Sequence, residues 1–330
     1  MKKLLLIFSA AIFFNAAQAQ SYHFSQFFAT PLLTNPANTG FTEGPYRVAS
    51  NLRSQGSSGN TFFTGYLSAD VSLLRERLPL GHKAGIGAYA MNDQSLTSAV
   101  QTNSVGLSAA YHVGFDPYGE HSFGLGVQGA VSQRKLDYSK LNFENQYGPN
   151  GFDPSLSAGE PLNFTNTQFF DLNIGAIYNV NLPDKAFFAG ISVYNILQHA
   201  DNMLTEEFKM PTRFTLQAGG QITVGLFGRI YTSFTAMRQA KATEVTVGSA
   251  FGLQLTEADK NELIGGLWYR YKDAMIPYIG YQRSGFQFGL SYDYTVSSLK
   301  AGSATKNGYE LTLMFKSADK RELKTHIPWY

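Results

Sequence analysis

The sequence predicts an all-β protein, a transmembrane antiparallel β-barrel of about 14 strands with a short N-terminal cap or plug segment. Apolar and polar residues alternate with a period of two in one segment after another, as expected for strands that separate two environments. The number of such segments is even, and lysine is scarce within them. Charged residues make up 15% of the chain, against about 25% in soluble globular domains. These observations favour a membrane barrel over a secreted β-sandwich or β-repeat protein.

The N-terminus has the features of a secretory signal peptide. Lys2 and Lys3 precede an apolar run at 4–14, and small residues follow as far as Ala19, so the mature chain is expected to begin at Gln20. The chain contains no cysteine, which leaves neither a lipid anchor nor a disulfide framework to expect. Removing two of the 26 basic residues leaves as many basic as acidic residues, 24 of each. A nucleic-acid partner is therefore not expected.

Residues 20–40 do not alternate, and they contain Pro31 and Pro36. We interpret this stretch as a short helix or coil that plugs or caps the following barrel. Its aromatic side chains need a place to be buried; they are Tyr22, Phe24, Phe27 and Phe28.

Alternation then recurs about every 20 residues, and each segment ends in turn-forming residues. The clearest segment is 285–294, where Phe, Leu and Tyr occupy one face and Gln, Gly, Ser and Asp the other. The remaining segments lie near 46–53, 63–71, 85–91, 104–113, 123–132, 171–180, 187–193, 213–222, 229–238, 245–256, 263–271, 274–283 and 309–315. We therefore expect a signal peptide at 1–19, a plug at 20–44, the barrel at 45–316 and a tail at 317–330.

The connections also alternate in length. Longer loops are expected near 54–60, 137–168, 198–211 and 296–307, each between an odd and an even strand. Most of the other connections are tight turns, with 75–82 as the exception. Long loops at one end and short turns at the other are typical of outer-membrane barrels, so the predicted location is the outer membrane.

If the apolar face meets lipid, the polar face lines a lumen that contains charges of both signs. The candidate lumen charges are Arg47, Arg53, Asp70, Arg213, Arg270, Asp293 and Glu310. If the first and last strands close the barrel, Arg47 or Arg53 could meet Glu310 on one side and Asp70 on the other. These charges could form a selectivity ring, hold a plug, or simply pair to fill the lumen, and the mixture of signs favours pairing.

No catalytic or metal-binding pattern stands out. The six histidines are scattered without the spacing of a zinc site, and no nucleophile elbow, phosphate-binding loop or dinucleotide fingerprint occurs. Glycine pairs such as Gly124 with Gly126, and Gly285 with Gly289, are interpreted as strand glycines that leave side-chain room inside the barrel. We predict a protein that is not an enzyme and binds neither a metal nor a cofactor.

Two stretches of the sequence stand out as motifs. The first is 23–28, His-Phe-Ser-Gln-Phe-Phe, followed by Pro31-Leu32, Asn35-Pro36-Ala37 and Gly40. The second is 291–299, which begins Ser291-Tyr292-Asp293. With these stretches the chain resembles the PorP/SprF family of the type IX secretion system of Bacteroidetes, and shorter pieces such as 91–94 also fit. The family-motif positions are His23, Phe24, Ser25, Gln26, Asn35, Pro36, Ser291, Tyr292 and Asp293. The chain departs from the family at Gly56, where a Trp is frequent, and at Ile327, where a Cys is frequent.

The resemblance implies an outer-membrane barrel surrounded by lipid that works with periplasmic secretion components. It also implies anchoring or export of surface proteins that carry a C-terminal signal domain, among them gliding adhesins. The basic tail from Lys316 to Lys324 would then face a partner, or be no more than a soluble end.

Two other functions remain open. Asn35-Pro36-Ala37 resembles the plug of FadL-like barrels, so a FadL-like or porin-type transport channel is one alternative, although the inward face is expected to be polar and charged. A structural or adhesive β-protein on the cell surface is the other.

Overall fold

The computed structural model describes residues 24–57, 60–149, 151–153, 155–159, 165–198, 200–201, 208–256, 261–297 and 307–318. The predicted signal peptide, His23 and most of the predicted C-terminal tail lie outside these residues.

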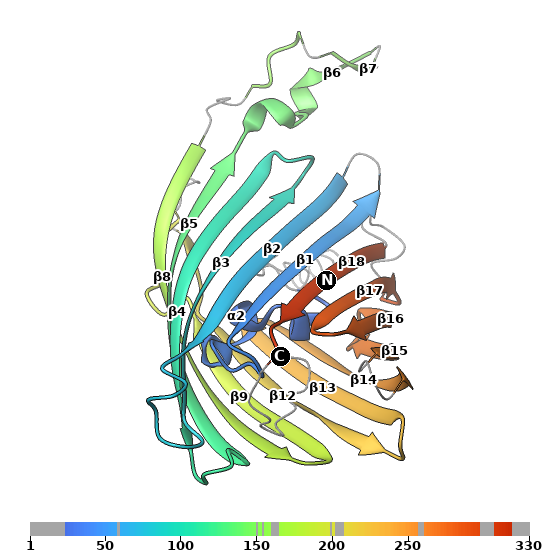
Figure 1. The fold of residues 1–330 in the computed structure, drawn as a ribbon. Helices are drawn as coiled ribbons and strands as arrows, with labels where there is room; N and C mark the ends of the chain where they lie inside the picture. The colour runs from blue at the N-terminus through green and yellow to red at the C-terminus, as the bar shows by residue number, and fades with distance from the viewer. Residues whose placement is uncertain are drawn as a thin grey trace, which may run out of the picture.

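Fourteen antiparallel strands form one closed barrel (Figure 1), which confirms the predicted fold class. The barrel strands are β1 (Tyr46–Ser57), β2 (Asn60–Leu73), β3 (Lys83–Ser95), β4 (Val100–Gly114), β5 (His121–Leu136), β8 (Thr165–Leu182), β9 (Lys185–Tyr194), β12 (Arg213–Val224), β13 (Gly228–Gln239), β14 (Ala242–Thr256), β15 (Asn261–Arg270), β16 (Ala274–Arg283), β17 (Phe286–Thr295) and β18 (Asn307–Lys316). Each strand pairs with its neighbours in chain order, and β18 pairs with β1 to close the barrel. We call the pair β1–β18 the closing seam.

The two ends of the barrel differ. The connections at 137–164, 195–212 and 296–306 all lie at one end, which we call the loop end. The first two contain the short elements η3 (Tyr138–Lys140), η4 (Glu144–Gln146), β6 (Tyr147–Gly148), β7 (Gly151–Phe152), β10 (Ala200–Asp201) and β11 (Phe208–Lys209). The predicted long loop near 54–60 is wrong, because β1 continues to Ser57 and β2 begins at Asn60. Polar residues there, which suggested a loop, belong to the ends of the two strands.

The opposite end, which we call the turn end, is where β1 begins and β18 finishes. It also contains the connection from β4 to β5, in which the Asp116 carboxylate accepts backbone N–H bonds from Glu120 (3.0 Å) and His121 (2.8 Å). These bonds to the charged form hold the pKa of Asp116 below its usual range.

The outer surface is an apolar belt. Leu107 is 72% exposed and Val105 58% exposed, both near the middle of β4. Exposed aromatic residues lie toward both ends of the strands, for example Phe63 and Phe170 near the loop end and Tyr111 near the turn end. An apolar band between aromatic girdles is the surface that a bilayer requires, and closure of the barrel leaves no strand edge unpaired.

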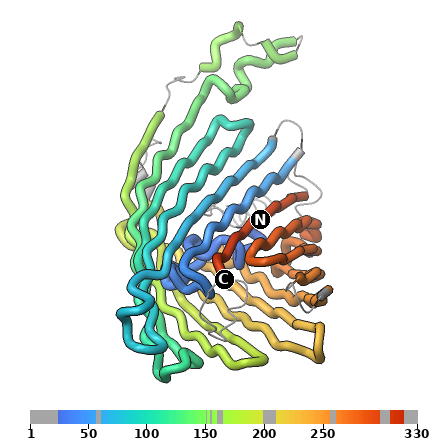
Figure 2. The backbone as a smooth tube through the Cα atoms, viewed as in Figure 1, coloured from blue at the N-terminus to red at the C-terminus, as the bar shows by residue number. Residues whose placement is uncertain are grey.

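Three short helices precede the barrel. They are η1 (Phe27–Ala29), α2 (Pro31–Thr34) and η2 (Pro36–Asn38). No helix in the described part of the chain has the length and apolar character needed to span a membrane. These three turns lie inside the ring of strands, as the blue N-terminal segment in Figure 2 shows.

Candidate functional site in the barrel lumen

The N-terminal segment occupies the lumen, and we call residues 24–44 the plug. Its residues from Phe24 to Thr42 are buried, apart from the half-buried Leu33. Pro31 and Pro36 stand at the first positions of α2 and η2, where a missing N–H costs no hydrogen bond. Asn35 separates the two turns, and its side chain accepts a hydrogen bond from the Ala37 N–H at 2.9 Å.

The start of the plug binds a carboxylate on the closing seam. Arg53 of β1 and Glu310 of β18 lie directly opposite each other across the seam and form an ion pair. Both oxygens of Glu310 also accept backbone N–H bonds from the plug, Oε1 from Ser25 (2.6 Å) and Oε2 from Gln26 (2.9 Å). One carboxylate therefore joins the first strand, the last strand and the plug.

A second carboxylate completes this group. Ser25 Oγ donates to Asp293 Oδ2 at 2.7 Å, and Arg53 and Arg270 reach the same oxygen at 2.9 and 2.7 Å. Arg270 also contacts Ser25 Oγ and pairs with Asp273 at 2.8 Å. We call Ser25, Arg53, Arg270, Asp293 and Glu310 the seam cluster. Its two arginines and two acids balance in charge, which a water-poor interior favours.

Gln26 is recognised by its side-chain amide. Its Nε2 donates to Ser291 Oγ at 2.9 Å, and its Oε1 accepts from Thr312 Oγ1 at 2.8 Å. The nitrogen and the oxygen of this amide are thus both paired, one with a residue of β17 and the other with a residue of β18, next to the seam cluster. Ser25 and Gln26 are held by specific polar contacts as well as by burial.

A second ion pair holds the end of the plug. Arg47 binds Asp70 through two parallel bonds of 2.9 Å, and it also donates to the Asn38 carbonyl at 2.9 Å. The Gly40 N–H donates to Asp70 Oδ2 at 2.7 Å. Both side chains of the pair are fully buried. Such bidentate pairs are the strong form of the arginine–carboxylate contact.

Strand glycines make room for the middle of the plug. A Cβ on Gly126 would lie 2.4 Å from the Ala37 nitrogen, and a Cβ on Gly175 would lie 1.9 Å from Asn35 Oδ1. The Asn35 amide donates to the carbonyls of Ala176 (3.0 Å) and Ile191 (3.2 Å). Gly126 therefore makes space for backbone of the plug, and Gly175 makes space for the Asn35 side chain. The interpretation as general side-chain room did not specify these partners.

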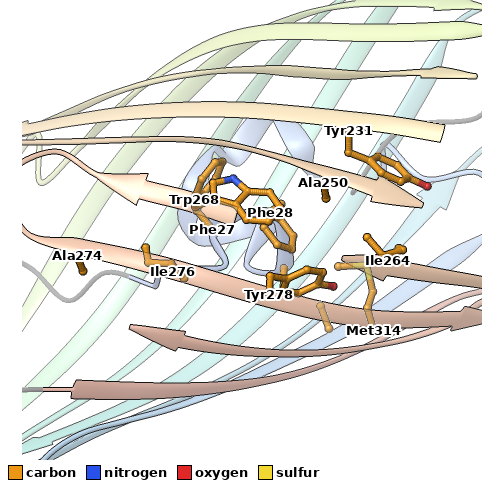
Figure 3. Packing of buried hydrophobic residues seen from close by; sticks show 12 residues of the cluster. Phe27, Phe28, Tyr231, Ala250, Ile264, Trp268, Ala274, Ile276, Tyr278 and Met314 are labelled. Carbon is orange, nitrogen blue, oxygen red and sulfur yellow. The ribbon is translucent and has the colours of Figure 1, made fainter. Parts of the chain in front are cut away.

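One side of the lumen is apolar, so the expectation of a uniformly polar inward face is wrong. Phe28 packs against Trp268 and Tyr278, with ring centroids 5.4 and 5.6 Å apart (Figure 3). Ile264 and Ile276 face inward beside them, and all are almost fully buried. Both faces of β15 and β16 are largely apolar, so alternation there does not distinguish lipid from lumen.

The structure places all seven candidate charges on the inward side, with exposures of 8% or less. Six of them belong to the two groups that hold the plug. Arg213 stands apart, lying over the Tyr194 ring (4.1 Å) with a longer contact to the Leu33 carbonyl (3.4 Å). Of the motif positions, Phe24 packs on Tyr66, whereas Tyr292 points outward against Tyr309.

Several residues that hold the plug were not singled out from the sequence. Gln128 donates to the Leu32 carbonyl (2.9 Å) and Ser192 to the Thr34 carbonyl (2.9 Å). Their strand phase predicts that they point inward, but their partners cannot be read from phase. Among the described residues, no group of three or more His, Cys, Asp and Glu side chains could hold a metal ion. The arrangement is built for binding a chain segment.

Comparison with solved structures gives several matches at low sequence identity. The toluene transporter TbuX of Ralstonia pickettii matches with 10% identity over 88% of this chain and 94% of its own, at a TM-score of 0.48. The toluene transporter TodX of Pseudomonas putida gives 8% identity over 86% and 92%, at 0.47. A FadL homologue of Pseudomonas aeruginosa gives 10% over 87% and 94%, at 0.46.

No curated protein matches the sequence. The family described as type IX secretion system membrane protein PorP/SprF matches residues 16–315, nearly the whole chain. This match includes the plug, the seam cluster and every barrel strand to Phe315. The chain therefore belongs to the PorP/SprF family of type IX secretion system membrane proteins.

Proposed function

We propose that this protein is a non-enzymatic outer-membrane component of type IX secretion that anchors or escorts exported surface proteins. The observation that carries the proposal is the plug bound from many sides of the lumen. Its hydrogen-bond partners lie on β1, β2, β4, β5, β8, β9, β12, β15, β17 and β18. Because the plug fills the lumen, the barrel is better suited to hold an exported protein at its rim than to pass that protein through the lumen.

The two ends of the barrel have different roles in this proposal. The loop end faces the cell exterior and contacts the exported protein through its C-terminal signal domain. The turn end faces the periplasm, where β18 finishes and the C-terminal tail that follows it meets other secretion components. Gliding adhesins are one class of cargo that the proposal covers.

Deletion of the gene tests this function. Surface proteins should disappear from the outer-membrane fraction and accumulate in the periplasm or the medium, and plasmid-borne wild-type protein should restore them. Quantitative proteomics of the cell fractions measures the change. An unchanged set of surface proteins in the deletion strain would contradict the proposal.

A transport channel is a second candidate, because the side of the lumen against which Phe27 and Phe28 pack is lined by apolar residues. In this alternative the plug would move aside and a hydrophobic molecule would take the place of the two rings. Liposomes containing the purified protein should then take up a labelled long-chain fatty acid faster than empty liposomes. Equal uptake would exclude the alternative.

A further inference from the structure

One side of the barrel wall extends further toward the loop end than the other. β4, β5 and β8 contain 15, 16 and 18 residues, whereas β15 to β18 contain 10 each. Figure 1 shows β5 and β8 rising above the ends of β16 and β17. The top of this wall has an outward face that continues the lipid-facing surface of the same strands.

The outward face changes character abruptly along these strands. Cross-strand register places Ala90, Val105, Val131 and Phe170 side by side as the last apolar row. The next row toward the loop end is Asn92, Asn103, Gln133 and Gln168. The row beyond it is Gln94, Gln101, Lys135 and Asn166. We call these last two rows the amide array, since seven of its eight side chains are carboxamides.

Part of the amide array is fixed by internal hydrogen bonds. Asn92 donates to Asn103 Oδ1 at 2.6 Å, and Gln94 donates to Asn92 Oδ1 at 2.8 Å. Within the residues the structure describes, the side chains of Gln133 and Gln168 make no hydrogen bond or ion pair. Asn166 and Gln168 are exposed and the other members are half-buried. The array thus combines a rigid half with amides whose donors and acceptors point outward.

The chemistry of the array fits a neutral polyhydroxyl ligand. A carboxamide both donates and accepts, as a sugar hydroxyl does, whereas phosphate is normally met by arginine and lysine clusters. A purely solvated protein surface usually mixes Lys, Glu and Asp, but here Lys135 is the one charge among eight positions. Four strands span about 14 Å and two rows about 7 Å, the dimensions of a short oligosaccharide.

We propose that the amide array binds the saccharide head groups of glycolipids in the outer leaflet. The array begins one row beyond the apolar belt, so its ligand lies where lipid head groups meet the barrel wall. Lipid acyl chains would cover the row of Val105 and Phe170, and the attached sugars would reach the amides. The proposal rests on the proposed outer-membrane location, with the loop end outside.

The experiment measures binding of purified lipopolysaccharide to the mature protein in detergent, with phosphatidylglycerol as the lipid without sugar. The test variant is Gln133→Ala with Gln168→Ala, which removes amides that have no internal partner. The matched control is Thr165→Ala with Thr167→Ala, which changes the inward face of β8 at the same height. We expect the Kd for lipopolysaccharide to rise about fivefold to tenfold in the test variant, and to stay unchanged in the control. Free core oligosaccharide should compete with lipopolysaccharide on the wild-type protein.

Three outcomes would overturn the proposal. The test variant could bind lipopolysaccharide as tightly as wild type, free oligosaccharide could fail to compete, or phosphatidylglycerol binding could fall in parallel. A test variant that keeps its lipopolysaccharide affinity but loses a surface protein in cells would assign the array to a protein partner instead. Because binding is measured on purified protein, its failure is separable from failure of the anchoring function, which the cell-fraction assay reports.

Discussion

At the scale of single residues, Glu310 joins three parts of the molecule. It pairs with Arg53 across the closing seam and accepts two backbone N–H bonds from the plug. Removing one member of a buried ion pair leaves the other charge uncompensated, which strongly lowers the stability of the protein. Replacing both members by apolar residues of similar volume is often neutral. The seam cluster should therefore tolerate paired changes better than single ones.

Glu310→Gln should lower the free energy of unfolding by about 3–5 kcal/mol, because Arg53 loses the Glu310 carboxylate and keeps only Asp293, which it shares with Arg270. Urea unfolding of the protein in detergent micelles measures the change. Glu76→Gln, in the exposed turn between β2 and β3, is the control and should be neutral. An equally neutral Glu310→Gln would mean that the seam cluster contributes little to stability.

Gly126 has no side chain, and it lies against the backbone of the plug at Pro36 and Ala37. Gly126→Val should destabilise the protein by about 1–3 kcal/mol, since its Cβ would collide with backbone of the plug at Ala37. Gly265→Val is the control, because a Cβ there meets nothing within 4 Å. Thermal unfolding of both variants compares them. Similar melting temperatures would show that the plug shifts easily within the lumen.

At the scale of elements, alternation locates strands well and assigns their faces unevenly. On β4 the two faces differ clearly, with Leu107 outside and Ser108 inside. On β15 and β16 both faces are largely apolar, because the inward side receives Phe27 and Phe28 of the plug. The aromatic residues of the plug pack against the inward apolar residues of β15 and β16, which we call the apolar lumen patch. Neither set of residues reveals in the sequence that the other is its partner.

Deleting residues 24–40 should increase ion conductance through the barrel. The deletion removes the groups that occupy the lumen and exposes charged side chains such as Arg47 and Asp70 to water. Single-channel recordings in planar bilayers measure the effect, with Phe28→Ala as a variant that keeps the plug backbone. A deletion protein that folds but conducts no better than wild type would show that another part of the chain closes the lumen.

At the scale of the whole molecule, the two faces of the sheet meet different environments. The outward face is the apolar belt that contacts lipid, and the inward face lines the lumen that the plug fills. Leu107 in the belt and Leu80 in the turn after β2 are similarly exposed, at 72% and 77%. In a soluble protein the two positions would respond alike to substitution. In a bilayer they would not, since the belt position faces hydrocarbon.

Leu107→Arg should destabilise the protein in lipid bilayers by about 2–4 kcal/mol, whereas Leu80→Arg should be nearly neutral. Unfolding by denaturant in liposomes provides the comparison. A neutral Leu107→Arg would contradict the placement of this face in the membrane.

The sequence by itself determined the strand segments, their even number, the inward phase of the charged residues and the family resemblance. These properties are local, because each depends on a period of two or on a short motif. Only the tertiary structure decided which inward residues meet, as when Ser25 reaches Glu310 from the other end of the chain. Such contacts depend on how the barrel closes and on how the plug folds within it. The apolar lumen patch and the amide array belong to the same class, because cross-strand register assembles them from residues that are scattered along the chain.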